Sequence, residues 1–307
     1  YGIAWHEKTL GQLFCDGSAR QIVAMLVEEC DKAGRNGGAV EQALGQPVTA
    51  VDHADGLFRI TLGSRTAAAP RLVVATGGPS IPKLGATGFA YDLARRFGLK
   101  VVEPRPALVP LTLGADETLF RTLSGVATEV VAAAGKTRFR EAALFTHRGL
   151  SGPAILQASS YWRHGEDISL DLLPERAAGW LREAKRTHPR TTLRRALAQH
   201  VPDRLAEALA ERLAVASDLA NTPDRVLDAA EQRLAAWSFR PTGTEGFTKA
   251  EVTVGGVSTA DLSQRDLEAK RVTGLHFIGE AVDVTGWLGG YNFQWAWASG
   301  WAAGQAV

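Results

Sequence analysis

Two short apolar strands that each run into glycine most constrain the fold of this chain. Residues 71–75 (RLVVA) lead into residues 76–78 (TGG), and residues 274–278 (GLHFI) lead into residues 279–280 (GE). In an open parallel sheet, ligands bind beyond the carboxyl ends of the strands, and glycine at that point allows a cofactor to touch the backbone. Each glycine pair alone also fits an ordinary tight turn. Together they predict an α/β fold with a dinucleotide site.

The chain divides into three zones. Residues 1–105 alternate helical and strand patterns, and residues 251–307 return to this α/β character. Between them, residues 106–250 read as an insert that is β-rich over 106–173 and helical over 174–237. With 307 residues, the chain is long enough for one large composite domain or about two domains.

The charge balance argues against two classes of partner. Lys and Arg number 34 and Asp and Glu number 33, so the formal net charge is +1 at pH 7. This balance gives no electrostatic reason to bind nucleic acid or an acidic membrane. In residues 174–237, acidic residues are mixed with basic ones, which favours a solvated face over a nucleic-acid-binding face. We therefore expect no nucleic acid and no membrane as a partner.

The cysteines and the chain ends concern localisation. Cys15 and Cys30 have neither Cys-x-x-Cys spacing nor a His-rich neighbourhood, so we expect no disulfide framework and no metal site, in a cytoplasmic protein. The sequence starts at Tyr1 without a signal-peptide pattern, which we interpret as a start inside a domain. Residues 284–307 carry no charge. Their glycines and amides favour a buried helix after a glycine turn over a membrane span.

A double glycine precedes the last helical pattern. Gly289 and Gly290 lead through residues 291–292 into a helix expected over 293–306. The first N–H groups of a helix lack partners and its dipole is positive there, so this end can stabilise a phosphate or the anionic edge of a reduced flavin. Tryptophans crowd this region, and we expect them to pack in the core rather than on a ligand: Trp287, Trp295, Trp297 and Trp301.

Five segments, in order along nearly the whole chain, resemble a known family. They are residues 75–88 (ATGGPSIPKLGATG), 145–153 (FTHRGLSGP), 254–257 (VGGV), 279–283 (GEAVD) and 289–294 (GGYNFQ). This combination resembles the BaiN/YhiN-type NAD(P)/FAD-dependent oxidoreductases. The resemblance implies a glutathione-reductase-like, Rossmann-type FAD-binding domain with an inserted β-barrel-like and helical substrate domain.

One family feature is missing from the sequence. The family opens with a strand and a Gly-x-Gly-x-x-Gly loop that holds the FAD pyrophosphate, whereas residues 34–38 (GRNGG) have neither that spacing nor a preceding strand. We therefore expect an upstream portion to be absent.

The resemblance also implies roles for individual residues. Val48 would lie at the adenine, residues 75–78 along the dinucleotide, residues 279–283 near the ribityl and pyrophosphate groups, and residues 289–292 at the isoalloxazine edge. The cofactor-binding residues so predicted are Val48, Ala75, Thr76, Gly77, Gly78, Gly279, Glu280, Asp283, Gly289, Gly290, Tyr291 and Asn292.

Few residues qualify for catalysis. His147, in a loop with Ser151, is the predicted proton donor or substrate ligand, and the alternative is a structural loop whose His and Ser cap backbone groups. Lys249 and Glu251 would either flank the flavin or lie on the surface. Cys15 has no second cysteine at the spacing of a disulfide reductase, which excludes a dithiol mechanism.

The resulting functional hypothesis is an FAD-dependent enzyme that transfers hydride between NAD(P)H and a small organic substrate. Two alternatives stay open: a non-catalytic flavin- or nucleotide-binding module, and an RNA-modifying flavoprotein. The second alternative requires a basic surface stripe, and we see no Lys/Arg block free of acidic residues. The sequence does not indicate the oligomeric state.

Overall fold

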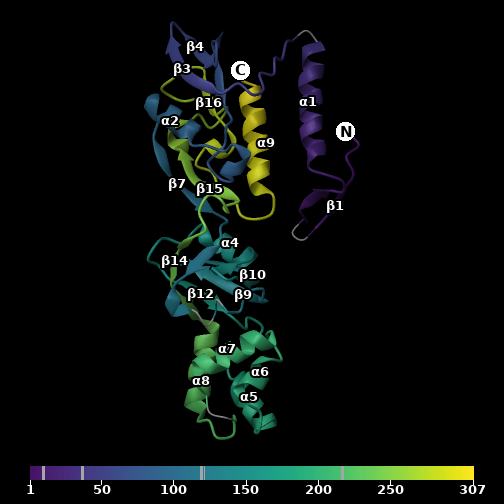
Figure 1. Cartoon of the computed structure of the whole chain (residues 1–307), viewed down its shortest axis with the longest axis vertical. Helices are drawn as coiled ribbons and strands as arrows, with labels where there is room; N and C mark the ends of the chain where they lie inside the picture. Colours follow the sequence, from purple (N-terminus) through teal and green to yellow (C-terminus); the bar gives the residue numbers. More distant parts are fainter. Residues whose placement is uncertain (9–10, 36–37, 118–119, 121, 216–217) are drawn as a thin grey trace.

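The computed structural model describes residues 1–8, 11–35, 38–117, 120, 122–215 and 218–307 (Figure 1). The molecule is elongated. One end holds α2, α9 and several short sheets, a curved sheet occupies the middle, and helices α5 to α8 form the other end. The segment 34–38, discussed above as a candidate pyrophosphate loop, includes residues 36–37, which lie outside the described residues.

The two glycine-terminated strands pair in parallel, as the sequence predicted for an α/β sheet. β6 (Leu72–Val74) and β16 (Leu275–Phe277) are in register along their lengths. A three-stranded antiparallel sheet and α2 (Phe89–Arg96) share a buried apolar core with this pair. The three strands are β3 (Val48–Ala54), β4 (Leu57–Leu62) and β5 (Arg65–Ala69).

A two-stranded antiparallel ribbon carries the chain out of this part of the molecule and back. β7 (Val101–Ala107) is the outgoing strand and β15 (Val252–Val257) is the returning one. The register shifts between Val254 and Gly256, and η5 (Gly279–Ala281) packs beside the returning strand.

The middle of the molecule is an open seven-stranded sheet. Its order is β13-β12-β9-β10-β11-β8-β14. Its edge strands β13 and β14 follow each other in the chain with only Arg240 between them, so the sheet must curve until its two edges approach. No pairing between these edges is present among the described residues, so the predicted barrel-like insert is a curved sheet and not a closed barrel. The strands are β8 (Leu111–Leu113), β9 (Ala127–Ala134), β10 (Thr137–Phe145), β11 (Gly149–Ser151), β12 (Ile168–Asp171), β13 (Trp237–Phe239) and β14 (Pro241–Thr244).

Helices cover this sheet and extend beyond it. Their apolar faces and the sheet form one continuous buried core, which includes Phe145, Leu170, Leu205 and Leu227. The helices are α4 (Pro153–Ser159), α5 (Trp180–Thr187), α6 (Leu193–Leu197), α7 (Asp203–Leu213) and α8 (Asp224–Ala235); the 3₁₀ turns are η2 (Pro82–Leu84), η3 (Ala115–Glu117) and η4 (Thr259–Asp261), beside η5.

The two ends of the chain carry exposed apolar side chains. β1 (Trp5–Glu7), β2 (Leu13–Cys15) and α1 (Arg20–Arg35) are drawn to one side of the rest in Figure 1. Val23 on α1 is 61% exposed, and Trp301 on α9 (Tyr291–Gly304) is 70% exposed. Among the described residues, no helix is long and apolar enough to cross a membrane.

Candidate functional site

The carboxylate of Glu280 joins the two glycine-containing turns. Its Oε1 accepts a hydrogen bond from the backbone N–H of Thr253 at 2.7 Å, and its Oε2 accepts one from the N–H of Gly78 at 3.4 Å. Burial raises the pKa of Glu280, and these two backbone donors act in the opposite direction. Segments about 200 positions apart in sequence thereby meet at the carboxyl ends of β6 and β16, at the edge where α/β folds bind ligands.

We call the place where residues 76–78 and 279–280 meet the glycine junction. Packing at this junction requires glycine at position 78. A Cβ at Gly78 would lie 2.6 Å from Oγ1 of Thr253 and 2.7 Å from the hydroxyl of Tyr91. Burial, followed by the nearby carboxylates of Glu280 and Asp283, raises the pKa of Tyr91, which therefore stays protonated at neutral pH. The structure accordingly places Gly78 inside the junction, whereas Ala75 and Thr76 just before it are exposed and open to a ligand.

The side chain of Asn292 bridges the loop before α9 to the first turn of that helix. Asn292 accepts a hydrogen bond from the N–H of Gly286 at 2.8 Å and donates one to the carbonyl of Gly286 at 3.1 Å. Gly290 is the N-cap residue, in a left-handed conformation with φ of 85°, and no side chain of the described residues caps this end of the helix. The first-turn N–H groups, beside the 60%-exposed Tyr291, are therefore available to an anionic ligand.

Gly279 anchors α9 through its backbone. Its N–H donates to Oγ of Ser299 at 2.9 Å, and its carbonyl accepts from Nε1 of Trp295 at 2.9 Å. Both polar groups of this predicted cofactor residue are thus used inside the protein. The backbone N–H of Asp283 is likewise bonded to the carbonyl of Val257 at 2.9 Å.

Val48 lies at the beginning of β3. It pairs with Leu62 on β4 and is 38% exposed, so its side chain is partly accessible. Its strand belongs to the same end of the molecule as β6 and α9, where the other predicted cofactor residues lie (Figure 1).

Sequence reasoning missed a partly exposed aromatic cluster at the loop before α9. The cluster comprises Phe139, Tyr161 and Trp287, and we call it the aromatic shelf. Nε1 of Trp287 donates a hydrogen bond to the hydroxyl of Tyr161 at 2.6 Å, and the ring of Phe139 meets Trp287 edge-on at 5.2 Å. Trp287 is 47% exposed and Tyr161 is 40% exposed. The shelf thus offers aromatic surface within three residues of Gly290.

The expected core packing of the tryptophans is wrong for three of the four. Trp287, Trp297 and Trp301 are all exposed, and only Trp295 is half-buried against the apolar core. The error arose because an apolar, uncharged segment does not reveal which helix faces have partners. Burial, followed by the charge of Arg163, lowers the pKa of Arg105.

His147 is at the tip of the tight hairpin between β10 and β11. Thr146 and Gly149 exchange backbone hydrogen bonds at 2.8 and 3.3 Å across this turn, and Ser151 pairs with Leu144 inside the sheet. His147 itself is exposed. The hairpin therefore connects two neighbouring strands of the curved sheet.

Two links connect this hairpin toward the glycine junction. Arg148 forms an ion pair with Glu245 at 3.5 Å, and in the same loop the carbonyl of Phe247 accepts a hydrogen bond from the N–H of Ile81 at 2.9 Å. Lys249 and Glu251 follow in this loop and are both exposed, in agreement with the surface interpretation.

Comparisons with known proteins identify the relatives of the chain. The family described as HI0933-like protein Rossmann domain matches residues 1–306. Ribosomal RNA dihydrouridine synthase of Escherichia coli (strain K12) is 50% identical over 311 residues, which covers 99% of this chain and 76% of that protein. The ribosomal RNA dihydrouridine synthase of Haemophilus influenzae is 42% identical over 314 residues, covering 100% of this chain and 77% of that protein.

A third relative acts on a different kind of molecule. The 3-dehydro-bile acid delta(4,6)-reductase of Clostridium scindens is 33% identical over 259 residues, covering 78% of this chain and 62% of that protein. All three relatives are named as enzymes of reductive chemistry, so the alternative of a binding module without turnover is not supported.

These matches overturn the expectation that nucleic acid is not a partner. Two relatives that align with essentially the whole chain are named for ribosomal RNA. The expectation failed because a net charge of +1 averages over the whole surface and conceals a local excess of one sign. On the family match and these identities, the chain belongs to the HI0933-like family of Rossmann-domain flavoproteins and is an NAD(P)H/FAD-dependent reductase.

Proposed function

We propose that this protein reduces uridine in ribosomal RNA to dihydrouridine. The observation that carries the proposal is the 50% identity, over 99% of the chain, with the ribosomal RNA dihydrouridine synthase of Escherichia coli. The reaction adds a hydride and a proton across the C5=C6 double bond of uracil, which is conjugated to a carbonyl group. NAD(P)H is the proposed source of the electrons.

FAD is the proposed hydride carrier, and the residues around the glycine junction fit it. The exposed backbone at Ala75 and Thr76 would follow the dinucleotide, and Val48 would contact the adenine. The free N–H groups at the start of α9, with Tyr291 and Asn292, would meet the electron-rich edge of the isoalloxazine ring. When bound, FAD supplies a hydride to the substrate. Glu280 would hold the two glycine turns in the geometry that receives it.

The aromatic shelf is the proposed binding surface for the uracil ring. Enzymes that modify a nucleobase take the base out of its stack and hold it against aromatic or apolar side chains. Trp287 and Tyr161 present such a surface, and their mutual hydrogen bond fixes the orientation of both rings. Arg105 and Arg163 are nearby cations for the RNA phosphates.

His147 stays the proposed proton donor for the second hydrogen. It is the exposed imidazole on a hairpin that is tied through Arg148 and Glu245 to the loop beside the glycine junction. An imidazole can donate a proton to carbon-bound substrate groups, as the addition to the double bond requires.

The test uses the full-length protein, FAD, NADPH and ribosomal RNA transcribed in vitro, which carries no modifications. Nucleoside mass spectrometry after digestion should detect dihydrouridine, formed only when NADPH is present. A steroid with a conjugated double bond serves as the competing substrate, because one relative is a bile-acid reductase. Reduction of the steroid while the RNA stays unmodified would contradict the proposed function and favour a small-molecule reductase.

A further inference from the structure

One stretch of the chain is strongly basic. Residues 184–202 contain five basic residues and no Asp or Glu. The expectation that the sequence has no Lys/Arg block free of acidic residues was therefore wrong. The basic residues are Lys185, Arg186, Arg190, Arg194 and Arg195. The following residues 203–231 contain seven acidic and three basic residues. The positive charge of residues 184–202 and the negative charge of residues 203–231 therefore nearly cancel in the total charge. This arrangement separates charge along the helices instead of mixing it.

The basic side chains on and around this stretch differ in whether an acidic residue pairs with them. Lys185 pairs with Asp224 at 2.9 Å, and Arg182 pairs with Asp228, so α8 neutralises the cations on one side of α5. The guanidiniums of Arg190, Arg194 and Arg195 are exposed, and none of them forms an ion pair with another described residue. We call these three residues the arginine face. Their charge is directed to solvent and is not used to hold the fold together.

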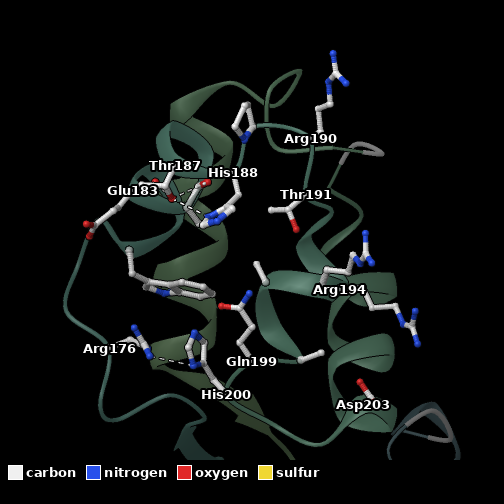
Figure 2. A pocket seen from close by; sticks show the side chains of 16 residues that line it. Arg176, Glu183, Thr187, His188, Arg190, Thr191, Arg194, Gln199, His200 and Asp203 are labelled. Carbon is white, nitrogen blue, oxygen red and sulfur yellow. Dashed lines mark hydrogen bonds between the residues drawn. The ribbon is translucent and has the colours of Figure 1, made fainter.

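The arginine face borders an open hollow of about 1070 Å³ between α5 and α6. Figure 2 shows Arg190 and Arg194 extending outward from its rim, with Arg176 and His200 facing each other at another side. Trp180 lies edge-on to the ring of His200 at 5.5 Å, so the lining includes an aromatic side chain. Glu183 and Asp203 are the carboxylates that also line it. Guanidiniums beside an aromatic ring are the groups that bind nucleic-acid backbone and bases.

The imidazole of His200 lines the hollow and contacts Arg176. Nδ1 of His200 lies 3.0 Å from Nη2 of Arg176, and burial followed by the charge of Arg176 lowers the pKa of His200. At neutral pH the imidazole therefore accepts a hydrogen bond from Arg176 and orients its guanidinium. A preoriented guanidinium loses less conformational freedom when it binds a phosphate.

The position of the arginine face determines the kind of partner. α5 and α6 lie at the end of the molecule opposite to α9 and the glycine junction (Figure 1). A nucleoside or a steroid bound at the junction cannot reach them, whereas a folded RNA can contact both ends at once. We propose that the arginine face is the docking surface for the phosphate backbone of the ribosomal RNA substrate. This proposal rests on the proposed function and adds where the bulk of the RNA binds.

The experiment measures RNA binding by the full-length protein with Arg190, Arg194 and Arg195 all changed to Ala. The matched control changes Arg225, Arg265 and Arg271 to Ala, which removes the same charge from other exposed positions. A third variant, with Lys at the three positions of the arginine face, keeps the charge. The probes are a labelled ribosomal RNA stem–loop long enough to span the molecule and a uridine dinucleotide, titrated over a range of salt concentrations. Circular dichroism verifies that each variant is folded.

The expected result is selective loss of stem–loop binding. The Ala variant should bind the stem–loop at least about tenfold more weakly, and the slope of log affinity against log salt should fall by about 2 to 3, because three phosphate contacts are lost. The control and the Lys variant should stay close to wild type, and the dinucleotide should bind all four proteins equally. Reduction of bound flavin by NADPH should not change.

Two outcomes would overturn the proposal, and they are distinguishable. If wild type reduces uridine in RNA but the Ala variant binds the stem–loop with unchanged affinity and salt slope, the docking surface is elsewhere and the proposed function stands. If wild type neither binds the stem–loop nor forms dihydrouridine, both proposals fail together. Equal loss in the Ala variant and the control would show that only total charge matters and would also contradict an arginine face.

Discussion

The indole of Trp287 donates its hydrogen bond to the hydroxyl of Tyr161, at 2.6 Å, and so joins the loop before α9 to the segment after α4. These residues come from parts of the chain separated by 126 positions. Figure 1 shows the loop before α9 on the side of that helix that faces α4 and the curved sheet. Any substrate that stacks on the aromatic shelf is therefore held by both parts at once.

The first prediction concerns this shelf. Changing Trp287 to Ala should raise the KM for uridine reduction in RNA about 5- to 150-fold, because stacking of a base on an aromatic ring contributes about 1–3 kcal/mol. Changing Trp287 to Phe keeps a ring and should retain most of the affinity. Steady-state kinetics with a ribosomal RNA fragment measures both. Trp5→Ala, at another exposed tryptophan, is the control and should leave the KM unchanged.

The second prediction concerns the bridge formed by Glu280. Glu280→Ala leaves the N–H groups of Thr253 and Gly78 without their acceptor, and each such loss costs about 1–3 kcal/mol when the group is kept from water. Urea unfolding should detect this loss. Retained flavin should also decrease, because the two glycine turns are no longer joined. A variant with unchanged stability would show that the carboxylate does not connect them.

The charge of Glu280 gives a third prediction with a definite sign. Its pKa in the folded protein is raised above 4.5, so the folded state holds this proton more tightly than the unfolded chain. The stabilisation is complete below the unfolded pKa and is lost as pH rises through the folded one. In Glu280→Gln, which does not titrate, the decrease in unfolding free energy just above pH 4.5 should be smaller than in wild type. Urea titrations at several pH values measure the difference.

The fourth prediction tests the packing of Gly78. Gly78→Ala should destabilise the protein by about 1–3 kcal/mol, as overpacking does, because its Cβ would lie 2.6 Å from Oγ1 of Thr253. Gly88→Ala is the matched control, since its nearest neighbour would be Cδ2 of Tyr91 at 3.9 Å. Thermal unfolding compares the two. Equal effects would indicate a general response to lost glycine, not a clash at the junction.

The fifth prediction concerns His200. Burial and Arg176 lower its pKa below 6.5, so the unfolded chain takes up this proton more readily than the folded protein. Stability should therefore fall as pH decreases through the range just below 6.5. His200→Gln should reduce this fall, and His188→Gln, at an exposed histidine of the same hollow, should not. Unfolding curves recorded across this range decide between the two variants.

Local signals in the sequence predicted the central junction well. Each glycine pair alone also fits a tight turn, but two apolar strands that both end in glycine predicted a sheet, and β6 and β16 do pair in parallel beside Glu280. The aromatic shelf could not be predicted in the same way, because Phe139, Tyr161 and Trp287 come from three segments far apart in the sequence. Whether that sheet closes depends on the pairing of its edges, which alternating strand patterns do not encode.

The sequence contains the signal for the arginine face, but counting charges over a long range conceals it. A window over residues 184–202 has no acidic residue, whereas the longer range 174–237 includes the acidic residues of the later helices. The exposed tryptophans are a different case. Hydrophobicity favours burial of Trp297 and Trp301, but burial also needs a partner surface, and their own segment does not specify one.

The ribbon of β7 and β15 has a consequence for how such proteins diverge. The chain leaves and re-enters one end of the molecule on two strands that are hydrogen-bonded neighbours, with Ala107 opposite Val252. Whatever lies between them can be exchanged, lengthened or reshaped without moving the ends to which it is attached. A different insert at this place would be attached through the same two strands, β7 and β15. The relatives of this chain are named for substrates as different as a ribosomal RNA and a bile acid, and an insert attached in this way is where such a difference can be built.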